Sequence, residues 1–425
     1  MLAARRFANV RPKVSAINLQ RMLLTTEQTA IIKATVPILE TGGETLTKHF
    51  YGNMLRDHPV VVPFFNKAHQ ASGDQPRALA NAVLMYAKNI ERLDNLGPLV
   101  GQIINKHVSL NINPDHYAVV GSCLLQAIRE VLGPKVATDA VIDAWGAAYG
   151  QLADILIGAE KNLMDTKAAA PGGWKGDREF VVKDKVKESS EITSFILAPA
   201  DGGKVLAHEA GQYLGLHLNV KDQEVRRNYS ISCASNGDHY RISVKREPGG
   251  LVSNHLHDDV KLGHKLKLHA PAGDFTLKKA ASDATKPVVF LTAGVGITPA
   301  MAMLHESLAN KSTRPVQFIH CARTTDCQAF RGVLQEICAK HAHVKYFSAY
   351  SDLPKPAATT DTVAYGMLSK DQLARWLPAN KDADVFFLGP KGFMASMKKN
   401  LLDLGVPAKQ LHWEFFGPAA DLDKA

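Results

Sequence analysis

Residues 288–299 read VVFLTAGVGITP, so the apolar run Val288–Leu291 passes directly into a glycine-rich turn. Glycines in such a turn let backbone N–H groups approach a diphosphate, and a helix that begins there favours the negative charge. Pro299 suits a first helical turn. A single Gly-x-Gly is a weak signal for nucleotide binding, and a plain turn is the alternative. Its position between a strand and a helix favours a nucleotide-binding site.

The segment around this turn alternates strands with helices. Apolar runs at 288–291, 316–319 and 385–388 predict buried strands, and a helix-like stretch follows each of them. This alternation is typical of an α/β unit with a parallel sheet. We therefore predict a nucleotide-binding domain over residues 282–425.

In the preceding segment, apolar residues recur with a period of two. Residues 192–197, 213–218 and 240–245 have strand length and are separated by turn signals, which predicts an antiparallel barrel over residues 177–281. We expect RNYS at 227–230 to begin a short strand, where the arginine could hold a phosphate and the tyrosine could stack on a flat ring. Taken alone, a solvated strand face is the better reading of RNYS. A second glycine-rich loop at 249–254 leads into a helix.

The first part of the chain is helical. Apolar residues recur at helical spacing in 99–108, 119–131 and 145–156, and NPD at 113–115 and GP at 133–134 separate these stretches. No strand alternation occurs, so residues 23–162 are predicted to form an all-α domain. Residues 163–176, which end in PGGWKG, are predicted to be a linker.

One histidine in the helical domain lies on an apolar face. His107 follows Ile103 by one turn and precedes Val108. A neutral histidine is the usual proximal ligand of haem in oxygen-binding proteins, although a core histidine is the commoner explanation of such a position. Helical spacing alone favours His107 only slightly as the haem ligand. The other candidates are His49, His58, His69 and His116.

Composition limits the class of protein. The 425 residues are 46% hydrophobic and 21% charged, which excludes a mainly disordered or collagen-like chain. No apolar run is long enough for a membrane-spanning helix. Five scattered cysteines indicate reduced thiols. The net charge is +9, and the first 26 residues hold five basic residues and no acid, so the mild excess elsewhere argues against nucleic-acid binding.

The basic N-terminus is typical of a targeting segment. Residues 1–22 are arginine-rich, acid-free and interleaved with apolar residues, as mitochondrial presequences are. A plain basic tail is the alternative. Met22 offers a second start that would yield a shorter form, so the expected location is the cytoplasm, the mitochondrial matrix or both.

The motifs of the last two domains resemble those of the ferredoxin–NADP reductase superfamily. The matching strings are Arg227-x-Tyr229-Ser230, the 249–254 loop, Gly294-Val-Gly-x-Thr-Pro299, QYL at 212–214 and EFFGP at 414–418. The helical segment resembles the globin domain of flavohaemoglobins in HFY at 49–51, FFN at 64–66, GDQ at 73–75, NKH at 105–107, the Pro114-x-x-Tyr117 pair and DAWGAAYG at 143–150. The resemblance extends from residue 23 to about residue 418. It implies a globin domain, an FAD-binding barrel and a Rossmann-like NAD(P)H domain.

The resemblance implies three cofactors: haem b, FAD and NAD(P)H. The residues implied for FAD are Tyr213, Arg227, Asn228, Tyr229, Ser230, Val252, Ser253, Phe415, Phe416, Gly417 and Pro418. Those implied for NAD(P)H are Gly294, Val295, Gly296, Ile297, Thr298 and Pro299.

The same resemblance implies roles around the haem. His107 would be the proximal iron ligand, with Tyr117 and Glu160 behind it, although a solvated surface acid is the alternative for Glu160. Tyr51 and Gln75 would face bound oxygen, and the alternative for Tyr51 is a core aromatic. The remaining implied residues are Leu79 and Phe65 at the haem, and Lys106 and Glu414 as redox-tuning residues that could equally be surface charges.

Two positions depart from the family pattern. Leu388 stands where the family usually has a cysteine near the nicotinamide, and Ala210 replaces a common proline. The choice between NADH and NADPH rests only on Arg323, which follows the 316–320 strand where a 2′-phosphate could be held.

The activity implied is that of a nitric oxide dioxygenase, which takes NO and O2 as its small-molecule partners and is expected to be a monomer. Two alternatives stay open, since a fold does not fix a function. One is an oxygen-binding or sensing globin that its own reductase keeps ferrous. The other is a haem-free flavin reductase with a helical interaction domain.

Overall fold

The computed structural model describes residues 24–280, 283, 285–357, 360–417 and 422. The predicted targeting segment 1–22 and Pro418 lie outside these residues. The described chain divides into two compact units, one of residues 24–62, 75–104 and 112–164, the other of residues 63–74, 105–111 and 165 onward, and each is described by itself. No described helix is long and apolar enough to cross a membrane.

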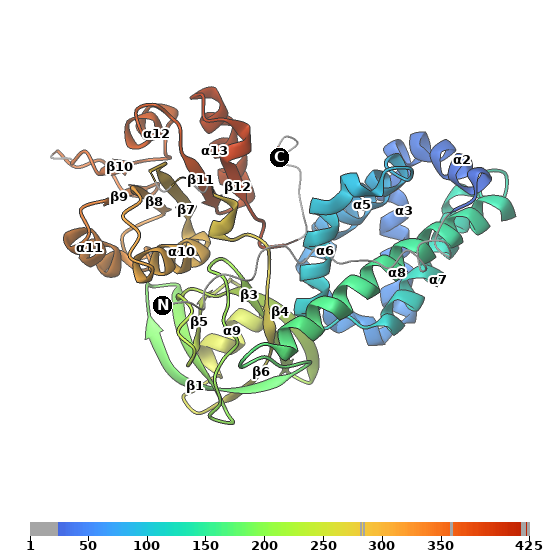
Figure 1. The fold of residues 1–425 in the computed structure, drawn as a ribbon, viewed down its shortest axis with the longest axis horizontal. Helices are drawn as coiled ribbons and strands as arrows, with labels where there is room; N and C mark the ends of the chain where they lie inside the picture. The colour runs from blue at the N-terminus through green and yellow to red at the C-terminus, as the bar shows by residue number, and fades with distance from the viewer. Residues whose placement is uncertain (1–23, 281–282, 284, 358–359, 418–421, 423–425) are drawn as a thin grey trace, which may run out of the picture. The chain divides into compact units, whose positions relative to one another are not determined.

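The first third of the chain is helical, as predicted (Figure 1). Capping boxes start two of its helices: Thr25 and Gln28 exchange hydrogen bonds before α2, and Asn113 and His116 do so before α7. The helices are α2 (Thr26–Ala34), α3 (Val36–Asp57), α4 (Lys67–Ala71), α5 (Asp74–Lys88), α6 (Gly97–Leu110), α7 (Pro114–Leu132) and α8 (Asp139–Ala169), with short 3₁₀ turns η1 (Pro59–Phe64) and η2 (Leu93–Leu96).

Helix α8 continues further than expected. The predicted linker 163–176 is helical up to Ala169, because Lys167, Ala168 and Ala169 are good helix formers and the first strong breaker is the Pro171-Gly172-Gly173 turn. The irregular connection is therefore only residues 170–177.

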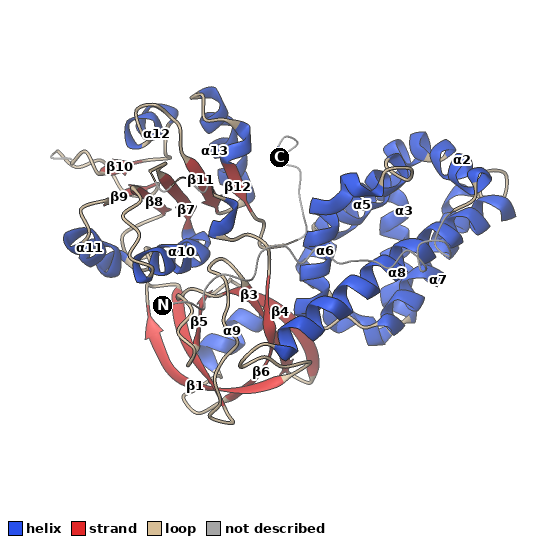
Figure 2. Ribbon diagram, in the orientation of Figure 1, coloured by secondary structure: helices blue, strands red, loops and turns tan. Residues whose placement is uncertain are grey.

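The second segment is a six-stranded antiparallel sheet in the order β4-β3-β6-β1-β2-β5. Its strands are drawn in red in Figure 2. Its inward residues form one apolar core, which includes Phe180, Phe195 and Tyr240. A bridge between Ile231 and Ile242 links the ends of the sheet, so the strands curl towards a closed barrel. The elements are β1 (Arg178–Lys187), β2 (Ile192–Pro199), β3 (Tyr213–Val220), β4 (Gln223–Ser230), β5 (Tyr240–Lys245), α9 (Leu251–Asp258) and β6 (Lys265–Ala272).

The expectation that RNYS begins a strand is wrong, because residues 227–230 end β4. The strand starts earlier because β3 and β4 form a hairpin whose two-residue turn is Lys221-Asp222, both with positive φ. Such turns usually contain glycine or asparagine, so a Lys-Asp pair is a weak sequence signal for this turn.

The third segment is a parallel sheet in the order β10-β9-β8-β7-β11-β12. Phe290, Phe318 and Phe386 pack with α10 and α11, whereas alternate residues such as Leu291 and Phe387 pack with α12 and α13. The sheet is therefore buried on both faces, as α/β proteins require. The elements are β7 (Val288–Ala293), α10 (Ile297–Ala309), β8 (Val316–Ala322), α11 (Arg331–Lys340), β9 (Val344–Tyr350), β10 (Val363–Tyr365), α12 (Lys370–Trp376), β11 (Asp384–Leu388), α13 (Lys391–Asp403) and β12 (Leu411–Trp413).

Candidate functional site

Tyr51 and Gln75 lie together in the helical unit. Tyr51 is in α3, Gln75 is in the first turn of α5, and the Gln75 amide donates to the Tyr51 hydroxyl over 3.2 Å. Burial raises the pKa of Tyr51 to about 12, although the hydrogen bond from Gln75 opposes this shift. Leu79 follows Gln75 by one turn and is half-buried. The hydroxyl therefore stays protonated at neutral pH in an apolar setting.

Tyr117 and Glu160 form a second buried polar pair. The Tyr117 hydroxyl donates to Glu160 Oε1 over 2.5 Å, and the Tyr149 hydroxyl donates to the Tyr117 carbonyl over 2.7 Å. Glu160 is only 2% exposed, so reading it as a surface acid is wrong. Burial and the Glu160 hydrogen bond both raise the pKa of Tyr117. The hydrogen bond fixes the carboxylate, because a phenol is a strong partner for an ionised acceptor.

His107 lies in the last turn of α6 and is half-buried. One turn earlier on this helix, Ile103 packs in the same apolar cluster as Tyr117. Two of the alternative histidines have partners on the helical unit's own side chains or backbone. His49 Nε2 lies 2.5 Å from Glu130, and His116 Nδ1 accepts the Asn113 N–H as part of a helix cap. Of the other two, His58 ends α3 and His69 lies in the short α4.

Lys106 and Glu414 interact electrostatically and are both half-buried, so neither is a fully exposed charge. Burial lowers the pKa of Lys106 and raises that of Glu414 to about 7, and the attraction between the two charges opposes both shifts. The Lys106 ammonium lies 5.6 Å from the ring centroid of Tyr213. This cation therefore lies directly beside an implied FAD residue. Phe65, also half-buried, follows η1.

Arg227 and Tyr229 share one face of β4, opposite Leu216 and Leu214 of β3. Arg227 donates to the carbonyl of Arg226 over 2.7 Å and forms no ion pair with a carboxylate among the described residues. Burial lowers the pKa of its guanidinium. A half-buried guanidinium without a carboxylate partner fits a ligand phosphate, and the face of the nearby Tyr229 fits a flat ring. These residues therefore fit the expected FAD.

The remaining implied FAD residues lie in several different settings. Asn228 and Ser230 lie on the other face of β4, and the Asn228 amide donates to Ser109 Oγ over 2.8 Å. Ser253 Oγ accepts the Glu247 N–H over 3.1 Å within its own loop. Val252 is buried in the first turn of α9, and Tyr213 begins β3. In the C-terminal segment Phe415 and Gly417 are half-buried, whereas Phe416 is 49% exposed.

The turn at 294–296 fits a diphosphate. Gly294 has a φ of +54°, and a Cβ at Gly296 would lie 2.5 Å from the carbonyl oxygen of Leu388. Helix α10 follows immediately, and no side chain caps its N-terminus. Its first N–H groups thus suit an anionic ligand. Of the implied residues Gly294 and Val295 are half-buried, whereas Gly296, Ile297, Thr298 and Pro299 are buried and shape the turn.

Some residues of these sites gave no usable sequence signal. Tyr149 belongs to the DAWGAAYG motif at 143–150, but its hydrogen bond to the Tyr117 carbonyl joins residues 32 positions apart. Arg323, considered for a 2′-phosphate, forms an ion pair with Glu191 at 2.7 Å. Such long-range partners depend on the tertiary fold.

Comparison with known proteins matches three domains to this chain. A globin model matches residues 48–156, an oxidoreductase FAD-binding domain model matches 179–277 and an oxidoreductase NAD-binding domain model matches 290–399. The flavohemoprotein of Pseudomonas aeruginosa is 58% identical over 94% of this chain and all of its own length. The chain belongs to the flavohemoprotein family.

Other relatives agree with this assignment. The flavohemoprotein of Pseudomonas putida is 60% identical over the same share of both chains. The crystal structure of a Malassezia yamatoensis flavohemoglobin with bound FAD and haem is 28% identical, covers 93% of this chain and 100% of its own, and has a TM-score of 0.81. The FAD/NAD-binding domain of a Vibrio cholerae nitric oxide dioxygenase is 39% identical, covers 57% of this chain and 99% of its own, and has a TM-score of 0.51. The predicted fold, a globin domain followed by an antiparallel FAD domain and a parallel α/β domain, is confirmed.

Proposed function

We propose that this flavohemoprotein is a nitric oxide dioxygenase that converts NO and O2 to nitrate with electrons from NAD(P)H. The observation that carries the proposal is the Tyr51–Gln75 pair, in which a buried tyrosine hydroxyl and a half-buried amide place two hydrogen-bond donors together in the helical unit. The similarity to the reductase part of the Vibrio cholerae nitric oxide dioxygenase supports the same reaction.

The cofactors carry the redox chemistry: bound haem supplies an iron that takes up O2, and FAD divides the two electrons of a hydride into single steps. The protein supplies binding and electrostatics. Arg227 would hold the FAD diphosphate and Tyr229 its flat ring. The 294–296 turn would hold the diphosphate of NAD(P)H on the N-terminus of α10.

On the proximal side we assign His107 to the iron. Glu160 is a positioning residue, because a carboxylate that accepts the Nδ1–H of a ligating imidazole makes the ligand more basic. Tyr117 keeps this carboxylate in one orientation through the 2.5 Å hydrogen bond. A Glu160→Gln variant should therefore raise the haem reduction potential while haem binding persists.

On the distal side, Gln75 donates to Tyr51, so this bond does not use the Tyr51 hydroxyl proton. A tyrosine hydroxyl is already protonated at neutral pH, and burial raises the pKa of Tyr51 further, to about 12. Tyr51 would donate to oxygen, and Gln75 would fix the direction of the hydroxyl. Leu79 would exclude water from this side.

The test is NO consumption by the purified holoprotein under air. We expect rapid loss of NO that depends on NADH or NADPH and yields nitrate in equal amount. Oxygen binding without NO loss would instead support the sensing or oxygen-binding globin. A purified protein without a Soret band would support the haem-free flavin reductase.

We also propose that the protein acts as a monomer in the cytoplasm, in the mitochondrial matrix or in both. Bacterial flavohemoprotein relatives support the first location. The basic N-terminal residues support the second. Sedimentation of the holoprotein and N-terminal sequencing of each cellular fraction test these assignments.

A further inference from the structure

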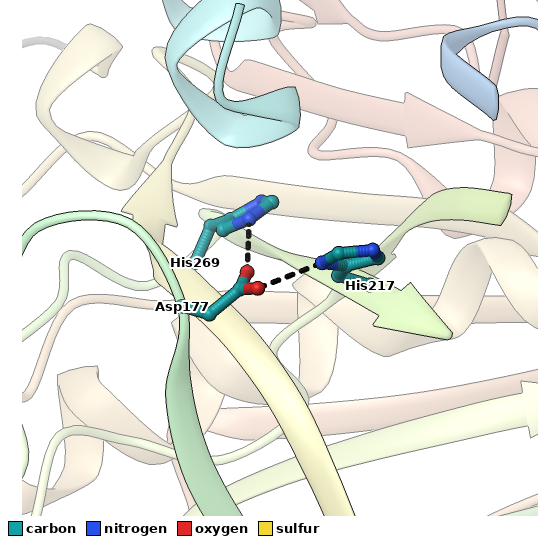
Figure 3. A group of neighbouring side chains, drawn as sticks. All are labelled: Asp177, His217 and His269. Carbon is teal, nitrogen blue, oxygen red and sulfur yellow. Dashed lines mark hydrogen bonds and ion pairs between the residues drawn. The ribbon is translucent and has the colours of Figure 1, made fainter. Parts of the chain in front are cut away.

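Three potential metal ligands meet on the outer face of the FAD-binding barrel (Figure 3). Asp177 directly precedes β1, His217 lies in β3 and His269 lies in β6. Asp177 Oδ2 lies 2.7 Å from His217 Nδ1, and Asp177 Oδ1 lies 2.7 Å from His269 Nε2. One ligand atom from each of the three residues lies within 4.8 Å of the others. None of these residues belongs to the haem, FAD or NAD(P)H sites described above.

His269 shows why the group is more than an ion pair. Its Nδ1 lies 2.8 Å from the carbonyl oxygen of Ser109, and because a carbonyl only accepts, this nitrogen carries the hydrogen. In the neutral ring, Nε2 is then a lone pair that faces the Asp177 carboxylate. Its side chain is only 3% exposed, and Nε2 has no hydrogen-bond partner within the described part of the chain. Nε2 and the Asp177 carboxylate would then be two facing acceptors, and either a proton on Nε2 or a metal ion between them makes this contact favourable.

His217 is held in the same manner. Its Nδ1 faces Asp177, and its Nε2 lies 3.0 Å from Glu224 Oε1. Each histidine thus turns one nitrogen to Asp177 and gives the other to an oxygen acceptor. Histidines that bind metals almost always have such an outer partner, because it fixes the tautomer and the direction of the ring.

We propose that Asp177, His217 and His269 form a binding site for a divalent transition metal of the zinc class. Two imidazole nitrogens and one carboxylate are a common zinc donor set, with water completing a tetrahedron. The same donors also suit copper and nickel, whereas magnesium and calcium prefer oxygen alone. A metal at about 2.0–2.2 Å from each ligand would replace the direct contacts between the three side chains.

The surroundings favour this site over a flexible surface cluster. His217 and His269 lie on adjacent strands, because β3 pairs with β6, and their ring centroids are 6.3 Å apart.

Metal binding would also affect the helix that carries His107. The outer nitrogen of His269 contacts the Ser109 carbonyl, and a Cβ at Gly215 would lie 1.8 Å from the same oxygen. Arg226 of β4 donates to the neighbouring carbonyl of Leu110 over 2.5 Å. The end of α6 is therefore packed closely on β3, β4 and β6, and a metal on His269 would stabilise this contact.

The experiment is equilibrium dialysis of the full holoprotein against micromolar Zn²⁺, followed by elemental analysis of zinc and iron. We expect one zinc per wild-type chain, and binding at least about 10-fold weaker in His217→Ala and Asp177→Asn. His255→Ala is the matched control, because the His255 Nδ1–Asp259 pair at 2.9 Å is an ordinary helix-surface pair. This control should bind zinc as the wild type does.

A second measurement locates the ion. Anomalous diffraction at the zinc edge should give one peak between Asp177, His217 and His269, separate from the haem iron. The proposal is overturned if the wild-type holoprotein binds no zinc at micromolar concentration, or if the His217 and Asp177 variants bind as much as the control. Retained FAD and haem in each variant show that the fold is intact, and none of these outcomes depends on dioxygenase activity.

Discussion

The helical region and the reductase region prepare their sites in different ways. In the helical region, buried side chains bond to each other, as Gln75 does to Tyr51 and Tyr117 does to Glu160. In the reductase region, the sites consist of the 294–296 backbone turn and a half-buried guanidinium at Arg227. In the proposed mechanism the first arrangement would orient and tune a reactive group, whereas the second would bind the phosphates of a cofactor. Substitutions of these side-chain pairs should therefore impair chemistry, and substitutions of Arg227 or of the turn should impair cofactor binding.

The largest expected effect is that of Arg227→Ala. The variant should lose most of its FAD during purification, because the charge-assisted hydrogen bonds of one arginine contribute about 1.5–3 kcal/mol. NADH-driven NO consumption should disappear while the Soret band remains. The flavin-to-haem ratio, read from the absorption spectrum, is the measurement.

Arg246→Ala is the control, since Arg246 lies in the same domain and pairs with Asp258 at the surface. It should keep its FAD. Full flavin retention in Arg227→Ala would contradict the phosphate-binding role.

Tyr51→Phe should give the next largest effect. Removing one oriented hydrogen-bond donor from an active site typically lowers turnover on the order of 100-fold, and oxygen should dissociate faster. FAD, haem and NADH oxidation by an artificial acceptor should be unchanged. Stopped-flow oxygen dissociation and NO consumption measure the two effects.

Tyr86→Phe separates this role from simple burial, because Tyr86 is also buried but donates to the backbone carbonyl of Ala148 over 2.8 Å. It should reduce stability without a comparable loss of turnover. Equal oxygen dissociation rates in the two variants would rule out a distal role for Tyr51.

Gly296→Ala should weaken NAD(P)H binding by about 10-fold, equivalent to about 1.4 kcal/mol. The added Cβ would lie 2.5 Å from the Leu388 carbonyl oxygen, so the turn must move away from its diphosphate-binding shape. Gly392→Ala is the control, because a Cβ there meets nothing within 4 Å. A KM for NADH that is the same in both variants would show that the turn does not bind the dinucleotide.

The smallest expected effect concerns the pH dependence of Glu414. Its folded pKa is raised from 4.5 to about 7 by burial, with Asp274 adding to the shift and Lys106 and Lys279 opposing it. The folded state therefore binds more protons than the unfolded state between these values, and stability falls as pH rises through this window. The wild type should therefore lose stability relative to Glu414→Gln as the pH rises from 4.5 to 7.

Denaturant unfolding of both proteins across this pH range is the measurement. Parallel pH profiles would show that Glu414 ionises normally in the folded protein.

Most of the architecture could be predicted from sequence because each region has its own hydrophobic period. The strand at 288–291 and the glycine turn after it depend on local sequence, and both are present in the structure. The start of β4 was missed because the Lys221-Asp222 turn lacks the usual residues. The helical extension to Ala169 was missed because the linker was defined by its glycines and not by the alanines before them.

The site was less accessible to sequence reasoning. Periodicity placed His107 on an apolar face, but nothing local distinguishes Glu160 from a surface acid, because its partner Tyr117 is 43 residues away. The same holds for Asp177, His217 and His269, which come from three separate segments. The roles of Tyr117 and Glu160 follow only from the resemblance to a known family. Asp177, His217 and His269 come together only in the folded barrel.

The most direct test of the account is the absorption spectrum of His107→Ala. We predict that the variant lacks the Soret band, keeps the flavin bands and still reduces an artificial electron acceptor with NADH, while NO consumption is lost. A variant that retains both the Soret band and wild-type NO consumption would contradict the assignment of His107 to the iron, and with it the proposed mechanism.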